Sequence, residues 1–375
     1  MTESVDDSSQ LKEKLSMAKN TLMKYTLVAL VILVGVSALS WWPTSVILAV
    51  IAVTVAVGTD YLLSLVMKAK GPLNTLSAAV FGLIVALSYT LSNPTSYIMG
   101  TYLKPYYLPE LLPTKAPWAF VYVAIIAFVG MIVFKKLQGL LGRKYVNPAA
   151  AAKLVVFLPF LQTVLLASAH ADSISLVGPI GYHINFSASG SNLLFGAFAG
   201  DVQACMGNLP SRAEIFAVTP AQMFQTLTLL KFHGWTGGAS AIAVVLVGVS
   251  LFVIARKYMK WRITLSYLAT IVAMSAIMFG IYGGDLLLRM GFELFIGSSI
   301  FLAFFMATDP ATTPWTYIGQ AVFGVGLGVL TVLIQMYMGF LGGSILALII
   351  MNLTTPLLDR IGNKKTLMTA NIPNA

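Results

Sequence analysis

The chain has 375 residues, of which 58% are apolar and only 10% are charged, and its mean hydropathy is +0.86. A soluble globular domain carries roughly a quarter charged residues, so this composition excludes an ordinary soluble enzyme and indicates an integral membrane protein. The net charge of +10 does not indicate a nucleic-acid partner, because the basic residues cluster at the ends of apolar runs, where membrane topology and anionic lipid account for them.

Ten apolar runs are long enough to cross the hydrocarbon layer, which needs about twenty helical residues. In chain order they are Tyr25–Trp42, Ser45–Met67, Leu73–Leu91, Trp118–Phe134, Ala149–Ala167, Gly237–Ala255, Ile263–Tyr282, Phe292–Ala307, Trp315–Tyr337 and Gly343–Leu358. Residues 1–24 alternate leucines with lysines, which predicts an amphipathic helix on the cytoplasmic membrane surface. Residues 169–235 are too polar for hydrocarbon, and residues 359–375 form a polar tail.

The basic residues predict the topology. The clusters at Lys68–Lys70, Lys135–Lys144, Arg256–Arg262 and Arg360–Lys365 fall on one side if the ten helices alternate in direction. The positive-inside rule makes that side the cytoplasm. We therefore expect a multi-pass protein of a prokaryotic cell (inner) membrane, with both termini cytoplasmic and the polar segment between the fifth and sixth helices outside.

The two groups of five runs, residues 25–168 and 236–358, resemble each other. Each has a proline-bearing break after its third run, and each has a Pro-Trp pair before its fourth, at Pro117-Trp118 and Pro314-Trp315. An odd number of spans forces two repeats into opposite orientation. The sequence therefore predicts an all-α integral membrane fold with ten transmembrane helices in two inverted five-helix repeats. The alternative is a chance recurrence of Pro-Trp pairs, since both residues are common at membrane interfaces.

Two polar positions stand at helix breaks on the expected cytoplasmic side. Asp309 follows Thr308 in the run FFMATDPATTPW, where its carboxylate can accept hydrogen bonds from a polar ligand or from its own turn as an Asx cap. Asn147 precedes Pro148 at the start of the fifth run. There its side chain can act as an N-cap or form hydrogen bonds with the edge of a bound heterocycle.

Two ionisable residues lie inside predicted spans at one membrane depth, namely Asp60 and Lys153. Buried charges need partners, so these two can pair with each other, Lys153 can instead extend to the interface, or both can line an ion path. The single cysteine and the three histidines match no compact metal motif. No nucleophile–base constellation, phosphate loop or dinucleotide fingerprint occurs in the sequence. These patterns leave a transporter and a redox subunit both open.

The order of motifs resembles the RnfD/NqrB family, the large membrane subunits of Rnf and sodium-pumping quinone oxidoreductase complexes. The residues that carry the resemblance are Asp60-Tyr61-Leu62, Asn147-Pro148-Ala149-Ala150, the run from Phe304 to Pro314, Phe323-Gly324, Met351-Asn352, and Pro356-Leu357-Leu358-Asp359. The resemblance covers nearly the whole chain, and the short N-terminal extension makes the chain more similar to RnfD than to the longer quinone-reductase subunit.

The resemblance implies FMN bound through its phosphate to a threonine hydroxyl between the fifth and sixth helices. Thr219, followed by Pro220, occupies that place, whereas Phe216, Ala217 and Val218 differ from the residues that precede the threonine in the family. Without a flavin, a threonine before proline is an ordinary residue of an extended turn.

The resemblance also implies riboflavin or another noncovalent flavin inside the helix bundle, for which Asn147, Thr308 and Asp309 are the candidates. On this view the chain is an electron-transfer subunit of a ferredoxin- or NADH-linked translocase. Electrons would pass between flavins across the bilayer, coupled to sodium or proton export, and no residue identifies the ion. The partners would include an FMN-bearing subunit and iron–sulfur subunits. The alternatives are an inverted-repeat secondary transporter or channel without flavin, and a scaffold that only holds partners.

Overall fold

A computed structural model describes residues 3–66, 75–91, 116–138, 144–156, 158, 228, 235–256, 259–282, 286–295, 299–338 and 343–361 of the chain. Within these ranges the protein is all-helical and contains no strand. The first half holds α1 (Glu3–Trp41), α2 (Thr44–Val66), α3 (Thr75–Leu87), α4 (Trp118–Val129), the π-helical η1 (Gly130–Leu137) and a helical stretch at 148–156. The second half holds η2 (Thr236–Gly238), α11 (Ala241–Ile254), α12 (Trp261–Tyr282), α13 (Leu286–Phe295), α14 (Ser299–Phe301), the π-helical η3 (Leu302–Met306), α15 (Tyr317–Met338) and α16 (Gly343–Leu358).

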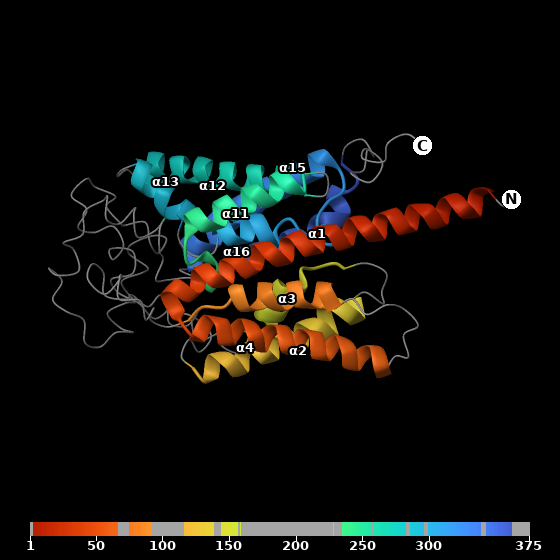
Figure 1. The fold of residues 1–375 in the computed structure, drawn as a ribbon. Coiled ribbons are helices and arrows are strands. Elements are labelled where there is room, and N and C mark those ends of the chain that lie inside the picture. Colours follow the sequence, from red (N-terminus) through yellow and green to blue (C-terminus); the bar gives the residue numbers. More distant parts are fainter. Residues whose placement is uncertain are drawn as a thin grey trace.

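The long helix α1 lies between the two halves of the molecule. Figure 1 shows α2, α3 and α4 on one side of α1 and the helices α11 to α16 on the other. Helix α1 contacts both α3 and α11. It also continues through residue 24 without interruption, so the helix expected at the N-terminus and the first apolar run form one continuous element.

The helices have the length and surface of membrane spans. Five of them among the described residues are long and apolar enough to cross a bilayer: Asn20–Trp41, Thr44–Val66, Trp118–Leu137, Trp261–Ile281 and Tyr317–Ile334. Large apolar side chains lie on their outer faces, for example Val31, Leu39, Leu62, Leu265 and Ile318, each between 54% and 67% exposed. An apolar outer surface of this extent is suited to lipid rather than water, and the chain is a multi-pass membrane protein.

Three of the expected spans differ from one continuous α-helix in their described residues. The third, predicted over Leu73–Leu91, has its α-helix α3 end at Leu87, and residues 88–91 are not helical. The sixth, predicted from Gly237, begins as the short turn η2, and its α-helix starts at Ala241. The described residues of the eighth, predicted over Phe292–Ala307, belong to α13, α14 and η3, and its last turn is π-helical rather than α-helical. The apolar runs overestimate these α-helices because they include the Ser-Tyr-Thr stretch after α3 and the Gly-Gly-Ala-Ser stretch before α11.

Glycines allow the closest helix contacts. A β-carbon added at Gly324 of α15 would lie 2.6 Å from the Ile263 carbonyl oxygen, and one at Gly328 would lie 3.0 Å from the Tyr267 carbonyl oxygen. Both acceptors belong to α12, so the spacing of small residues on α15 lets the two backbones approach as in other membrane bundles.

Candidate functional site

The eighth helical segment stops in the interior of the bundle, and its last residues form the first part of the site. Helix η3 ends at Met306. The Thr308 hydroxyl, buried at 4% exposure, then donates back to the Phe304 carbonyl at 2.8 Å. The half-buried Asp309 accepts a hydrogen bond at 3.0 Å from the Ala311 amide through Oδ1. Asp309 therefore forms the Asx cap that was one of its two predicted roles.

Asn147 brings the first half of the chain to this break. Its Oδ1 accepts from the Ala149 and Ala150 amides at 3.1 and 3.2 Å, as an N-cap does. Its Nδ2 donates to the Met306 carbonyl at 3.2 Å. One side chain thus caps the helix at 148–156 and satisfies a carbonyl at the end of η3. Asn147, which is distant in sequence, therefore belongs to the same local arrangement as Thr308 and Asp309.

Lys260 holds the turn that follows Asp309. Its ammonium donates to the Pro310 carbonyl at 3.2 Å and to the carbonyl and hydroxyl of Thr313 at 2.9 and 2.8 Å. It also lies 4.9 Å from the centroid of the Trp315 ring, and the Trp315 amide donates to the Asp359 carboxylate at 2.8 Å. Because Lys260 is 2% exposed, this cation acts as an internal tie between the start of α12 and the turn.

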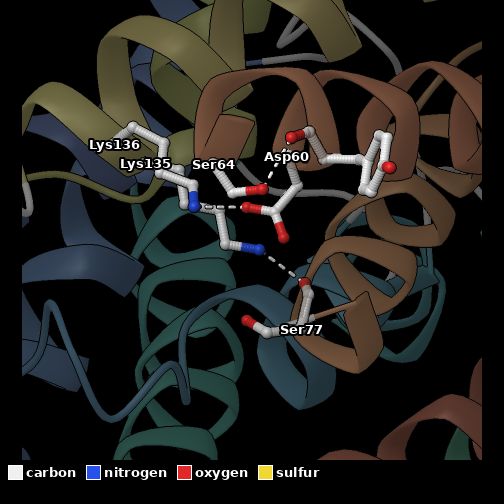
Figure 2. Close-up of polar contacts among 6 residues, drawn as sticks. Asp60, Ser64, Ser77, Lys135 and Lys136 are labelled. Carbon is white, nitrogen blue, oxygen red and sulfur yellow. Dashed lines mark hydrogen bonds and ion pairs between the residues drawn. The ribbon is translucent and has the colours of Figure 1, made fainter. Parts of the chain in front are cut away.

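Asp60 forms a second polar cluster, drawn in Figure 2. Its Oδ1 is paired with the ammonium of Lys136, whereas its Oδ2 is buried without a hydrogen-bond partner. The neighbouring Lys135 donates to the Ser77 carbonyl at 2.5 Å and lies 5.3 Å from the centroid of the Phe81 ring. The two lysines belong to η1, and π-helical turns are frequent at functional sites.

Lys153 occupies a third position, away from Asp60. Its ammonium donates to the Ser88 carbonyl, just past the end of α3, and lies 4.7 Å from the centroid of the Trp235 ring. Lys153 is 2% exposed. The sequence allowed an ion pair between Asp60 and Lys153, but Asp60 instead pairs with Lys136. The Lys153 side chain is buried in the bundle at the end of α3.

The end of α3 also meets the start of the second half. The Thr236 amide donates to the Tyr89 carbonyl at 2.9 Å, and the Thr236 hydroxyl donates to the Ala86 carbonyl at 3.1 Å. The Trp235 ring packs edge-on against Phe301 of α14, with 6.0 Å between ring centroids. The end of α3 and the segment α14–η3 are therefore both in contact with residues 235–236, at the start of the second half.

Sequence reasoning missed the roles of Lys136 and Lys260. Both were interpreted only as topogenic charges, since each lies beside an apolar run, and no local signal shows that one pairs with Asp60 or that the other is buried against the turn after η3. Thr219, the predicted site of covalent FMN, lies outside the described residues. Among the residues that the structure describes, no group of three or more His, Cys, Asp or Glu side chains is arranged to hold a metal ion.

Comparison with known proteins places these positions in a family. Residues 99–367 match the NQR2, RnfD, RnfE family. The chain is 26% identical over 365 residues to the D component of the Na(+)-translocating ferredoxin:NAD(+) oxidoreductase complex of Acetobacterium woodii, covering 96% of this chain and 94% of that protein. It is 28% identical over 278 residues to the D component of the proton-translocating ferredoxin:NAD(+) oxidoreductase complex of Clostridium ljungdahlii, covering 72% and 73%. It is 29% identical over 259 residues to the D component of the ion-translocating oxidoreductase complex of Pseudomonas aeruginosa, covering 69% and 72%.

The matched region includes Asn147, Lys153, Lys260 and the turn at Asp309, and the similarity to the first of these relatives extends over nearly the full length of both proteins. On this match, which spans well over half of the sequence, the chain belongs to the NQR2, RnfD, RnfE family.

Proposed function

We propose that this chain is the RnfD membrane component of an Rnf-type ion-translocating oxidoreductase complex, in which it carries electrons across the bilayer through flavins. The observation that carries the proposal is the similarity over 96% of the chain to the corresponding component of such a complex. Two of the relatives are named for different ions, sodium in one and protons in the other. Their names therefore support translocation of a cation without selecting which one.

The proposed architecture is ten transmembrane helices in two inverted repeats, with residues 169–235 outside the membrane. Its support is a reciprocal arrangement at the ends of α3 and η3. The end of α3, in the first half, is met by Thr236 of the second half. The end of η3, in the second half, is met by Asn147 of the first. Broken elements at the centre of inverted repeats commonly form the working site of membrane carriers.

The second, noncovalent flavin is proposed at Asn147, Thr308 and Asp309, and their remaining hydrogen-bonding capacity fits it. A side-chain amide has two N–H donors, and Asn147 uses one of them on Met306, so one N–H remains for a ring acceptor. The Thr308 hydroxyl oxygen can accept a hydrogen bond from the flavin while its proton is donated to the Phe304 carbonyl. Nearby apolar side chains, including Phe304 and Phe305, are buried and exclude water. A bound flavin would supply the one- and two-electron chemistry.

The first flavin is proposed as FMN attached through its phosphate to the Thr219 hydroxyl. Its support is the place of Thr219-Pro220 in the polar segment between the fifth and sixth predicted helices. Iron–sulfur centres and the nucleotide reaction would then belong to partner subunits, including one that carries FMN. Asp60 with Lys136, and Lys153 at the end of α3, are the proposed polar positions of an ion path.

The test is flavin analysis of the natively purified complex. Mass spectrometry of the peptide that contains Thr219 is expected to show an FMN adduct. A fluorescent band should survive denaturing electrophoresis in the wild type and in the control Thr226→Ala, and it should be lost in Thr219→Ala. Persistence of the band in Thr219→Ala would show that another residue carries the flavin. If the complex contains no flavin in this chain, the redox function is overturned. The alternative function, a secondary transporter or channel that binds no flavin, then remains.

A further inference from the structure

Asn352 is a buried amide whose two polar atoms have no partner. It lies on α16, its exposed fraction is 0%, and neither Oδ1 nor Nδ2 makes a hydrogen bond. Buried polar groups in native proteins are almost always satisfied by protein, ordered water or an ion. An unpaired amide in the interior of a membrane bundle is therefore expected to have an ordered water or an ion beside it.

Two further buried oxygens without hydrogen-bond partners lie where α15, α16 and the turn after η3 meet. Thr355, one turn after Asn352, donates to the Thr312 carbonyl at 3.0 Å, which places the Thr312 turn against this face of α16. The Thr312 hydroxyl itself is buried without a partner. So is Oε1 of Gln320 on α15, whose Nε2 donates to the Pro314 carbonyl at 3.3 Å.

The pairing of α15 with α16 brings Gln320 to the level of Asn352 and Thr355. The Thr316 hydroxyl donates to the Leu358 carbonyl at 3.4 Å at one end of the contact. At the other end, a β-carbon on Gly326 would lie 2.8 Å from the Met351 sulfur. Because the two helices run antiparallel, the turn of α15 that carries Gln320 falls opposite the turn of α16 between these two contacts.

We propose that Asn352 Oδ1, Gln320 Oε1 and Thr312 Oγ1 bind a partly hydrated Na⁺ between α15, α16 and the turn after η3. Oxygen ligands suit hard cations, and a set of neutral oxygens suits a single positive charge better than a double one. A water retained by the ion accepts the hydrogen bond of Asn352 Nδ2 through its second lone pair. This arrangement satisfies both orphan atoms of the amide.

The charges around the junction permit a bound cation. Lys260 is a buried positive group beside the junction, and its ammonium is directed at Pro310 and Thr313 on the turn. The carboxylates of Asp309 and Asp359 cap the same turn from both ends and offset that charge. The inference rests on the proposed function, because an ion-exporting protein requires a place where the ion exchanges some of its water for protein oxygens.

The experiment uses the purified complex in liposomes and measures the Na⁺ concentration that half-saturates reductant-driven ²²Na⁺ uptake. Its melting temperature is followed in NaCl, KCl and choline chloride at equal ionic strength, since a ligand of the native state raises it. Asn352→Leu is expected to raise the half-saturating concentration about tenfold or more, as removal of supporting groups does at metal sites. Asn352→Asp is expected to lower it, because the added charge attracts the ion.

The matched control is Ser37→Ala, which removes another buried, unpartnered side-chain oxygen at 0% exposure, on α1. It should leave the Na⁺ response unchanged. An equal Na⁺ response of uptake and melting temperature in the wild type, Asn352→Leu and Asn352→Asp would overturn the inference and assign the junction to ordered water. A wild-type complex with no Na⁺-specific effect would overturn it as well. Flavin absorbance recorded on the same samples separates the two proposals, because a complex that keeps its flavins but lacks this Na⁺ response refutes the cation site alone.

Discussion

The Asn147 side chain donates a 3.2 Å hydrogen bond to the Met306 carbonyl across 159 positions of sequence. The same amide caps the helix at 148–156 through its oxygen. The two ends of one small side chain therefore fix the start of one helix to the end of another. This relationship defines the geometry of the proposed noncovalent flavin site.

Asn147→Asp separates these two roles. Aspartate caps a helix as well as asparagine does, but it replaces the donor with a carboxylate oxygen facing the Met306 carbonyl. We expect a loss of about 1–3 kcal/mol from the unpaired buried carbonyl and the repulsion, together with loss of the noncovalent flavin. The measurement is the melting temperature of the complex and its flavin content after denaturation. If Asn147→Asp keeps both flavins, Asn147 does not hold the second one.

The Asp60–Lys136 pair should respond asymmetrically to its two single substitutions. Asp60 is 2% exposed, whereas Lys136 is 32% exposed and reaches water. Lys136→Met leaves a buried carboxylate without its main partner, for which the typical cost is roughly 3–5 kcal/mol. Asp60→Asn leaves a lysine that solvent can accommodate, so its cost should be smaller.

The double variant Asp60→Asn with Lys136→Met tests this explanation as a mutant cycle. It should recover much of the stability that Lys136→Met alone loses, because no uncompensated buried charge remains. Equal melting temperatures for the two single variants would mean that Lys135, the next lysine of η1, neutralises Asp60 in place of Lys136. Reductant-driven ion uptake by the same variants tests the proposed ion path.

The long helices could be predicted from the sequence because their apolar runs exceed the thickness of a bilayer. The predicted spans Ser45–Met67 and Ile263–Tyr282 differ from α2 and α12 by no more than two residues at either end. The third and eighth spans could not be predicted in the same way. Their ends are determined by partners distant in sequence, Lys153 and Thr236 at the end of α3 and Asn147 at the end of η3.

The candidate site could be predicted only in part. Asn147 and Asp309 were found because proline follows each of them, and a polar residue before proline marks a helix break. The partner of Asp60 was not found. Lys153 was considered because it lies at the same predicted membrane depth, but the π-helical turn η1 brings Lys136 to the carboxylate. Asn352 was noticed only through its place in a family motif, and its lack of partners is a property of the packed structure.

Gly82 should be intolerant of a single added methyl group. A β-carbon there would lie 2.8 Å from both the Ala52 carbonyl oxygen and the Val53 Cα of α2, and backbone atoms cannot move aside cheaply. We expect Gly82→Ala to destabilise the protein by about 1–3 kcal/mol through overpacking. Gly58→Ala is the matched control, since nothing lies within 4 Å of its added β-carbon, and it should stabilise the helix by up to about 1 kcal/mol. Similar melting temperatures for the two variants would show that α2 and α3 are not in close contact.

Lys260 should determine the shape of the turn after η3. Lys260→Met keeps most of the side-chain volume but removes three hydrogen bonds, one to Pro310 and two to Thr313. Since buried carbonyls then lose a charged donor, we expect a loss of roughly 1–3 kcal/mol and a shifted reduction potential of the noncovalent flavin, as the turn contains Asp309. The control is Lys24→Met, which removes an exposed lysine of α1. Potentiometric titration and melting of both variants provide the measurement. A Lys260→Met complex that matches Lys24→Met in both would show that Lys260 neither shapes the turn nor acts on the flavin.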